Sequence, residues 1–171
     1  MKTIKFVFAG VLLLMVSMTY GQELKFGHVN SQQLVSELPE YISAMSSLES
    51  EAKVLQDRRT VMQEEAQRKY TEYLTSRDSL PELVRATMEK DIQDLQQRLE
   101  NYDLLAQQTI GKKQQDLLQP ILEKINKAIE DAGAENGFIY IFDVSTPIIL
   151  YHSDKSIDCS EIIKKKLGIT N

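Results

Sequence analysis

The sequence has few of the residues that interrupt helices. Its 171 residues include seven glycines and four prolines, and no glycine lies between Gly27 and Gly111. Within that interval the only prolines are Pro39 and Pro81. Because glycine and proline are the residues least compatible with a helix interior, their scarcity predicts very long helical segments on both sides of Pro81.

Cysteine and positive charge are also scarce. Cys159 is the single cysteine, which excludes an internal disulfide and a cysteine-based metal cluster. The 20 lysines and arginines are outnumbered by 25 aspartates and glutamates, so the formal net charge is -5. An acidic chain without an extended basic stripe argues against nucleic acid as the main partner.

The sequence also lacks motifs that indicate catalysis. It has no glycine-rich phosphate loop, no paired-histidine zinc motif and no Gly-x-Ser-x-Gly elbow. His28 and His152 fall in or beside expected strands, and Cys159 has no recognisable catalytic partner, so all three are interpreted as structural residues. We therefore expect no enzyme activity, no catalytic or metal-binding residue, and no cofactor.

Residues 1–21 have the layout of a secretory signal. Lys2 and Lys5 precede an apolar stretch over residues 6–18, and small residues stand at Thr19 and Gly21. The apolar stretch is shorter than the roughly 20 residues that a membrane-spanning helix needs. We expect cleavage near Gly21 and an exported protein, with an uncleaved membrane anchor as the alternative.

A helical repeat dominates the middle of the chain. Between residues 40 and 113 apolar side chains recur at spacings of three and four, with one break. The members of this seam are Tyr41, Met45, Leu48, Ala52, Leu55, Met62, Ala66, Tyr73, Met88, Ile92, Leu95, Leu99, Tyr102 and Ala106. A seam this narrow must pair with another helix to be buried. The pattern predicts an antiparallel helical hairpin that folds near residue 78 and places Leu48 opposite Thr109.

The turn of this hairpin, residues 76–81, combines serine, aspartate and proline, which favour turns. Asp78 or Ser79 is expected to cap the second helix. Apolar side chains crowd on both sides of the turn, where they would either close the hairpin or offer an exposed surface to partners. The candidate partner-binding residues are Met62, Tyr70, Tyr73, Leu74, Leu80, Leu83 and Met88.

Strands are expected on both sides of the hairpin. Residues 24–29 are β-prone and lead into a short helix over residues 32–38. Residues 138–142 form a continuous apolar run, which is typical of a fully buried strand. After a turn, residues 148–151 predict a third strand.

Two further helical segments accompany these strands. Residues 117–132 carry a broad apolar stripe, typical of a helix that faces a globular core, and Gly133 and Gly137 are expected to end it. A last short helix is expected to begin at residues 156–158 and to end in the lysines at 164–166. Those lysines complement the negative end of a helix.

The sequence therefore predicts an α+β fold in which a hairpin arm, residues 39–118, is inserted into a body formed by residues 22–38 and 119–171. A body of this size buries little surface alone, and its strand edges need cover, so we expect an oligomer. The residues expected to build this oligomerisation body are Phe26, Val29, Ile121, Ile125, Ile129, Phe138, Tyr140, Phe142 and Ile149.

The most distinctive stretches of the chain are Val29-Asn30-Ser31, Leu38-Pro39-Glu40-Tyr41 and the segment from Pro120 to Phe142. Through these stretches, the whole chain after residue 21 resembles the Skp/OmpH family of periplasmic chaperones. The resemblance implies a jellyfish-shaped homotrimer whose bodies join through strands and whose helical arms enclose a cavity. It also implies a periplasmic, ATP-independent protein that keeps unfolded outer-membrane β-barrel proteins soluble for delivery to the outer membrane.

Two other classes of function remain open at this point. One is a structural coiled-coil scaffold of the cell envelope, which would bridge fixed partners. The other is an envelope module with weak contact to the membrane or to lipopolysaccharide through the lysines at 164–166. The acidic charge is a departure from the strongly basic familiar members of the family, and it disfavours simple charge attraction to acidic clients.

Overall fold

The computed structural model describes residues 24–169. The expected signal peptide, with its cleavage point near Gly21, lies outside these residues. Among the described helices, none is both long enough and apolar enough to cross a membrane. The elements in chain order are β1 (Lys25–Val29), α2 (Ser31–Glu37), α3 (Pro39–Ser76), the 3-10 helix η1 (Arg77–Ser79), α4 (Glu82–Asn136), β2 (Phe138–Asp143), β3 (Ile157–Asp158) and α5 (Ser160–Leu167).

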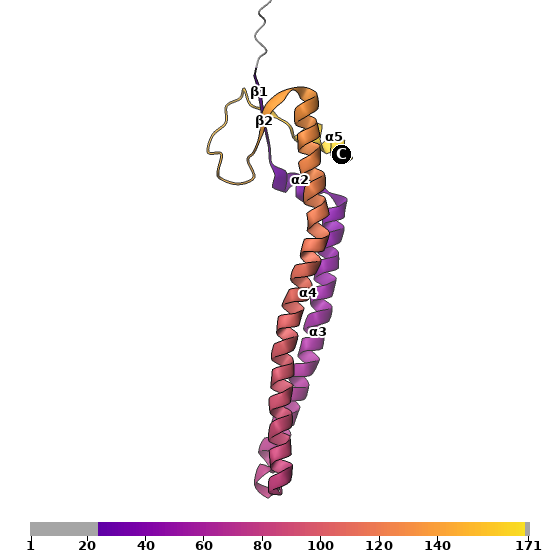
Figure 1. Ribbon diagram of the computed structural model, residues 1–171, viewed down its shortest axis with the longest axis vertical. Coiled ribbons are helices and arrows are strands. Elements are labelled where there is room, and N and C mark those ends of the chain that lie inside the picture. The colour runs from indigo at the N-terminus through magenta and orange to yellow at the C-terminus, as the bar shows by residue number, and fades with distance from the viewer. Residues whose placement is uncertain (1–23, 170–171) are drawn as a thin grey trace, which may run out of the picture.

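These elements form a small body from which a long helical hairpin extends (Figure 1). Helices α3 and α4 run antiparallel side by side, and the strands, α2 and α5 gather around the end of α4 that lies farthest from the turn. The expected α+β class with two long helices is therefore confirmed.

The arms begin and pair as the sequence pattern predicts. Pro39 is the first residue of α3, and Leu38 before it is extended, with φ -73° and ψ 127°, because a proline ring disfavours helical angles in the preceding residue. The hydroxyl of Tyr102 donates to the backbone carbonyl of Leu55 on the other arm over 3.1 Å. This contact agrees with the expected register of the hairpin.

The turn between the arms differs from the expectation at its cap. Helix α3 ends at Ser76, and Pro81 occupies the N-cap position of α4 without a side-chain cap. The prediction that Asp78 or Ser79 caps this helix is wrong. The Ser79 hydroxyl instead donates to the Ser76 carbonyl over 2.8 Å, and Pro81 holds Leu80 in an extended conformation that sets the entry into α4.

Helix α4 continues past Gly133 and extends to Asn136. The sequence predicts that Gly133 helps to end the helix, but Gly133 lies within α4 and has no positive φ. The end comes at Gly137, whose φ of 69° lies in the left-handed region that glycine adopts readily. The chain then reverses into β2, which brings the sheet back against the last turns of α4.

The sheet has three parallel strands in the order β2-β1-β3. The central strand β1 pairs with β2 along its length, and Gly27 and His28 pair with β3. The prediction of a third strand at residues 148–151 is wrong, because these residues lie in the loop between β2 and β3. Both sides of β1 are already paired, and the loop extends away from the sheet (Figure 1), so residues 148–151 are left without the ladder that defines a strand.

Strand β2 is also less buried than its apolar run predicts. Phe138 and Ile141 pack against the body core, but Ile139 and Tyr140 are 46% and 60% exposed. The prediction of a fully buried strand is therefore wrong for a single chain. Helix α4 packs against β2, and the exposed residues lie on strand positions that this packing does not cover.

The body core lies where the upper part of α4 meets α2, α5 and the sheet. Its buried members are Val29, Leu34, Leu38, Ala44, Ile121, Ile125, Ala128, Ala132, Cys159, Ile163 and Leu167. Of the residues expected in the body, Val29, Ile121 and Ile125 lie in this core, and Ile129 and Phe138 are partly buried against it.

The last helix begins later than expected. Helix α5 starts at Ser160, because residues 157 and 158 pair with β1 as strand β3. Ser156 also stays outside the helix, with its Oγ 2.9 Å from Nδ1 of His28. The lysines at 164–166 fall in the last turn of α5, as expected.

Asp143 joins the end of β2 to the start of α2. Its carboxylate accepts hydrogen bonds from the Ser31 hydroxyl over 2.5 Å, the Ser31 backbone N–H over 3.2 Å and the Ser145 backbone N–H over 2.9 Å. Partial burial raises the pKa of this carboxyl, but the bonds from Ser31 and Ser145 outweigh burial, and the pKa is lowered from its ordinary value. The charged carboxylate thus stabilises the junction between sheet and helix.

Replacing Asp143 with asparagine is expected to destabilise the fold by about 1 kcal/mol at neutral pH, since Ser31 and Ser145 lose a charged acceptor that is partly exposed. Because the folded-state pKa is lowered, this contribution is present above the ordinary value of 3.8 and is lost as pH falls through the folded-state pKa. Urea midpoints measured down to about pH 2 should show the parent and variant converging in acid. Asp154→Asn is the control, and a difference independent of pH would contradict the assignment.

Candidate functional site

The structure separates the seven candidate residues near the arm tip into two groups. Leu83, Leu74 and Tyr70 are exposed, with exposed fractions of 80%, 46% and 44%. The half-buried group comprises Met62, Tyr73, Leu80 and Met88. The tip therefore presents some apolar side chains to solvent, while others are partly covered.

Tyr73 shows what the second group does. Its hydroxyl donates to Oε1 of Glu89 on the opposite arm over 2.6 Å, and this hydrogen bond to a carboxylate raises the pKa of Tyr73. This hydrogen bond thus connects α3 to α4 near the turn. The apolar surface that remains open to a partner at the tip centres on Leu74 and Leu83.

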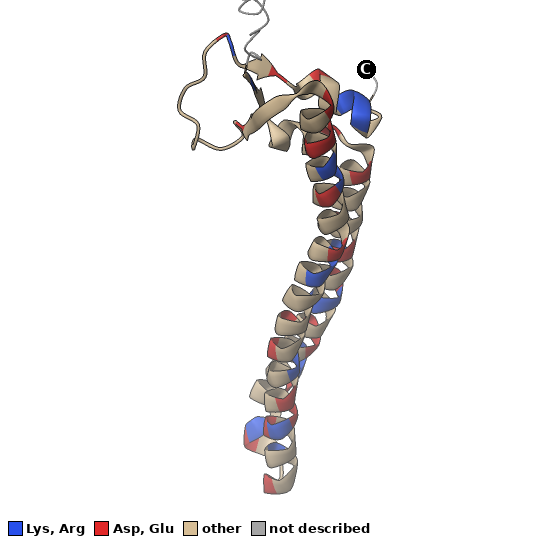
Figure 2. Cartoon of the chain, turned by 45° about the horizontal axis from the view of Figure 1, so that its top comes forward, with Lys and Arg blue, Asp and Glu red and all other residues tan. Residues whose placement is uncertain are grey.

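Charged side chains of both signs occur along both arms (Figure 2). The ion pairs that join α3 to α4 are Arg59–Asp103 at 2.7 Å, Lys113–Glu51 at 2.9 Å and Lys124–Glu40 at 2.6 Å. Arg59 occupies a seam position and makes a second contact to the same carboxylate over 3.2 Å. Partly exposed pairs of this kind contribute little net stability, so they set the register of the arms more than they hold the arms together.

A second exposed apolar area lies at the base of α3, where the seam pattern predicts none. Ile42, Met45 and Val54 are 60%, 43% and 55% exposed, and the exposed Ser46 and Ser50 lie between them along the helix. We call these five residues the root surface. The spacing of Met45 predicts a position inside the seam, but in the structure its side chain is only partly covered.

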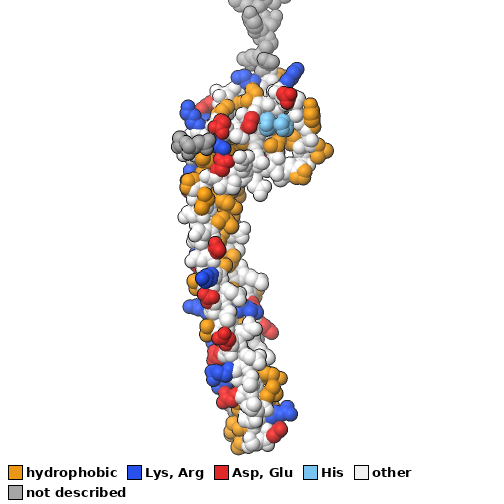
Figure 3. Space-filling view, turned by 180° about the vertical axis from the view of Figure 1, so that it is seen from behind, with side chains coloured by type: hydrophobic (Ala, Val, Ile, Leu, Met, Phe, Trp, Pro, Cys, Tyr) orange, Lys and Arg blue, Asp and Glu red, His pale blue; other side chains and the backbone are white. Residues whose placement is uncertain are grey.

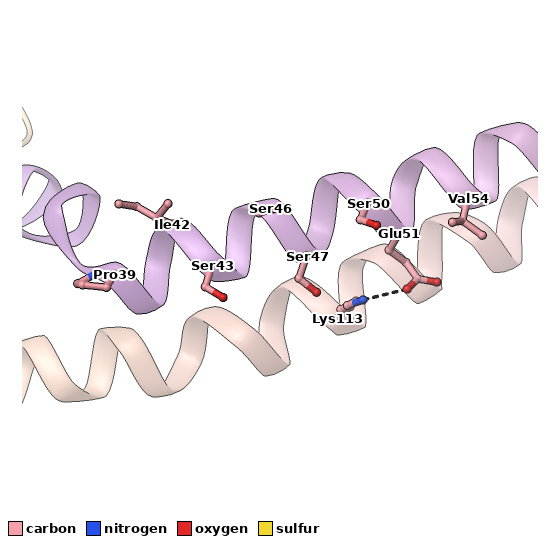
Figure 4. A pocket seen from close by; sticks show the side chains of 9 residues that line it. All are labelled: Pro39, Ile42, Ser43, Ser46, Ser47, Ser50, Glu51, Val54 and Lys113. Atoms are coloured by element: carbon pink, nitrogen blue, oxygen red, sulfur yellow. Dashed lines mark hydrogen bonds and ion pairs between the residues drawn. The ribbon is translucent and has the colours of Figure 1, made fainter.

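Shallow grooves run beside Ile42. One has a volume of about 660 Å³ and continues along α3 to Val54 and the Lys113–Glu51 pair (Figure 4). Ser43 and Ser47 point toward α4 in this view, whereas Ile42 projects from the side of α3 away from α4. The other groove has a volume of about 760 Å³ and includes Met45. Ile42 and Ser46 line both grooves, so α3 has open space on both sides of these two residues.

A third apolar area covers one side of the body. Phe26, Tyr140 and Phe142 form a stacked row, with ring centroids 6.3 Å and 5.7 Å apart. Ile149, the last expected body residue, is half-buried in the loop between β2 and β3. Its loop neighbours Ile148, Leu150 and Tyr151 are 80%, 89% and 81% exposed. Figure 3 shows hydrophobic side chains gathered on this part of the body and on the upper arm.

The lysines at the end of α5 are largely engaged within the chain. Lys164 is 2.7 Å from Glu37, with a side chain only 12% exposed, and Lys166 is 2.7 Å from Glu135. The hydrogen bond with Glu37 raises the pKa of Lys164. Two of the three lysines are thus paired with carboxylates, and the cluster offers little free charge to an anionic surface.

The histidines and the cysteine have structural surroundings. His28 and His152 stack with ring centroids 4.1 Å apart. Cys159 is fully buried in the body core, and burial raises the pKa of its thiol, which suppresses thiolate reactivity. Within residues 24–169, no three His, Cys, Asp or Glu side chains are grouped so that they could hold a metal ion.

The fold is a long helical hairpin on a small parallel-sheet body, with exposed apolar areas on both parts. Residues 25–167 match the family model described as outer membrane protein (OmpH-like), and the chain belongs to this family. It is a periplasmic chaperone family associated with outer-membrane proteins rather than an enzyme family. A search of curated proteins found no significant match.

Proposed function

We propose that the exported chain is an ATP-independent holdase that binds unfolded outer-membrane β-barrel proteins in the periplasm and keeps them soluble. The observation that carries this proposal is the spread of exposed apolar side chains from the root of the hairpin to Leu83 near its tip. A holdase has to contact many different sequences weakly, and a large, adaptable surface serves that purpose better than one deep pocket.

The client-contacting residues at the tip are proposed to be those expected from the sequence, with Tyr70, Leu74 and Leu83 making the direct apolar contacts. The half-buried methionines Met62 and Met88 would allow the surface between the arms to repack, because methionine is flexible and polarizable. Family membership supports outer-membrane proteins as the clients.

The division into a body, residues 22–38 and 119–171, and an arm, residues 39–118, is part of the same proposal. Three copies would join through their bodies into a jellyfish-shaped homotrimer. The stacked row of Phe26, Tyr140 and Phe142 and the exposed loop support this assembly, because a single chain leaves them in contact with water.

An envelope scaffold is the second candidate, and the length of the paired helices α3 and α4 favours it. A scaffold would use the hairpin as a rigid spacer and would have no effect on the aggregation of unfolded clients. The third candidate, a module that binds lipid or lipopolysaccharide through the C-terminal lysines, loses support because Lys164 and Lys166 are paired with Glu37 and Glu135.

The test is the dilution of a urea-denatured outer-membrane β-barrel protein into buffer with and without the chain lacking residues 1–21. We expect light scattering to be suppressed without ATP once chaperone oligomers match the client in number. An unrelated acidic helical protein at the same concentration is the control. Unchanged aggregation would contradict the holdase proposal, and a mass measurement in solution tests the trimer separately.

A further inference from the structure

The two histidines of the chain lie in contact with each other. His28 belongs to the central strand β1 and His152 to the loop between β2 and β3, and the sequence contains no other histidine. Their rings stack with centroids 4.1 Å apart and an angle of 25° between the ring planes. Histidine is the side chain that ordinarily changes its charge between pH 5 and 8, so both residues of this kind are concentrated at one contact.

This contact joins the loop to one face of the sheet. Side chains alternate between the two faces along a strand, so His28 shares a face with Phe26, whereas Val29 is buried in the body core. Figure 3 shows the imidazoles together on the surface of the body, beside hydrophobic side chains. A cavity of about 450 Å³ lies here, and loop and sheet both contribute to its wall. Its lining comprises Phe26, His28, Phe142, Ile149, Tyr151, His152, Ser153, Lys155 and Ser156.

The loop is tied to β1 at both of its ends. At the start, the Val144 backbone N–H donates to the Val29 carbonyl over 2.9 Å. At the end, the Ser156 hydroxyl lies 2.9 Å from Nδ1 of His28. Between these two points, His152 supplies the ring that stacks on β1. The stacked pair therefore holds the middle of the loop in place.

Protonation affects this stack in two stages. One proton is compatible with it, because a cation can lie over the face of an aromatic ring. A protonated His28 can also keep its contact with Ser156, by donating from Nδ1 to the hydroxyl. Protonation of both rings places two positive charges at a separation of 4.1 Å. Repulsion at about this distance shifts an equilibrium about fivefold even in bulk water, and by more at a partly covered site.

The sheet offers one negative group against these charges. Asp158 of β3 is the register partner of His28, and the partner on β2 is the uncharged Phe142. The Asp158 carboxylate accepts the Ser160 N–H over 2.9 Å. Hydrogen bonding from Ser160 lowers the pKa of Asp158, and the charges of His28 and of Lys164 on α5 lower it further. Asp158 is therefore still negative in mild acid and offsets one of the two protons.

The loop and the end of β2 add no net compensation. Lys155 lines the cavity with a further positive charge, and the exposed Asp154 beside it carries the opposite charge. Tyr151 also lines the cavity, and a phenol is uncharged in mild acid. The carboxylate of Asp143 accepts the Ser31 hydroxyl over 2.5 Å. A doubly protonated pair therefore keeps an unbalanced positive charge.

We propose that His28 and His152 form a pH-sensitive latch, which holds the loop over residues 144–156 against the sheet and releases it when both rings are protonated. The latch acts on the face that carries the stacked row of Phe26, Tyr140 and Phe142. Its effect on assembly rests on the proposed homotrimer, whose copies would join through this face, so mild acid would weaken their contact.

The test uses the chain lacking residues 1–21, with labelled isoleucine methyl groups and histidine rings, observed by NMR between about pH 7.5 and about pH 5. At the higher pH we expect through-space contacts between the two imidazoles, and a resonance of the half-buried Ile149 that is shifted by the nearby rings. At the lower pH the imidazole contacts should be lost. The Ile149 resonance should move toward that of an exposed isoleucine, with a ratio of closed to open loop at least fivefold lower.

Two variants and a change of salt identify the cause. His152→Phe keeps an aromatic ring but accepts no proton, so its loop should stay closed at both pH values. Asp154→Asn, which removes a carboxylate from the same loop, should open in acid as the parent does. Both positions are exposed, and circular dichroism checks that the variants are folded. Salt at about 1 M, which screens exposed charges beyond about 3 Å, should partly close the parent loop again in acid.

Three results would overturn the latch. The first is a parent whose imidazole contacts persist at about pH 5. The second is an acid opening of the same size in His152→Phe, which would assign the change to another group. The third is an acid opening that salt does not reverse, because repulsion between partly exposed charges has to respond to screening.

Solution mass at both pH values separates the latch from the proposed assembly. We expect the parent oligomer to dissociate in acid at a concentration at which His152→Phe remains assembled. If the parent is a monomer at both pH values, the homotrimer proposal fails, and the imidazole contacts alone decide whether the latch exists. If the loop opens in acid while the mass of the oligomer is unchanged, the latch does not regulate assembly, and that part of the inference is overturned.

Discussion

Replacing Gly27 with alanine is expected to destabilise the body by about 3 kcal/mol, at the upper end of the usual effect of overpacking a core. Gly27 lies in the central strand β1, where it pairs with Ile141 of β2 and Ile157 of β3. A Cβ at this position would overlap with Sγ of Cys159 and would lie 3.1 Å from Cε1 of Phe138. Because β1 is bonded on both sides, the strand cannot move aside to make room.

The neighbouring sulfur provides the control for this prediction. Cys159 is fully buried and its side chain is short, so its sulfur atom cannot move to another position. The double variant Gly27→Ala/Cys159→Ala should recover a large part of the lost stability, although the contact with Phe138 remains. Urea denaturation of the four proteins in this cycle measures the coupling between the two sites. Strictly additive effects, or a Gly27→Ala variant as stable as the parent, would contradict the steric argument.

Features that depend on one stretch of chain were predictable from that stretch. The hairpin follows from a periodic seam and from the absence of glycine, the start of α3 follows from Pro39, and the end of α4 follows from Gly137. Each of these reflects backbone preferences or a local period, and these act without knowledge of the rest of the fold.

The parts that the sequence did not predict depend on contacts between distant segments. Residues 148–151 have strand-forming side chains, but a strand also needs a neighbour, and β3 rather than this segment pairs with β1. Tyr140 belongs to an apolar run, but whether it is buried depends on a layer over the exposed face of β2, which a single chain does not supply. Intrinsic propensity indicates which segments can form a strand, and hydrogen-bond pairing with a neighbouring strand decides which of them does so.

The candidate site shows the same division between local features, which the sequence predicts, and long-range contacts, which it does not. The sequence pointed to Leu74 and Leu83, which are exposed, but it grouped them with Tyr73, which bonds to Glu89 across the arms. At the root, Met45 fits the seam period, and only the structure shows that its side chain is partly open to solvent. The signal that could have identified the root surface is the uncharged stretch from position 41 to position 48, which stands out in an otherwise charged helix.

Removal of the distal arm is expected to abolish the holding of whole clients while leaving the body folded. The variant replaces residues 55–105 with a short glycine-serine linker. The buried members of the body core all lie outside this segment, and the Lys113–Glu51 and Lys124–Glu40 pairs at the base of the arms are kept. The distal arm itself contributes a narrow seam and partly exposed ion pairs, so its loss should cost the body little.

The shortened chain separates the stability of the body from the holding of clients. The body core and the ion pairs at the base of the arms are kept, so the body should unfold at about the same urea concentration as in the parent. In the proposed holdase, the arms contact a whole unfolded barrel protein at many apolar segments. The shortened arms would lose most of these contacts, so light scattering should rise to the level seen without chaperone. Circular dichroism and solution mass verify that the body is folded and assembled. An unfolded product would mean that the arm is required for the body core, and undiminished holding would mean that clients bind to the body and the root of the arm alone.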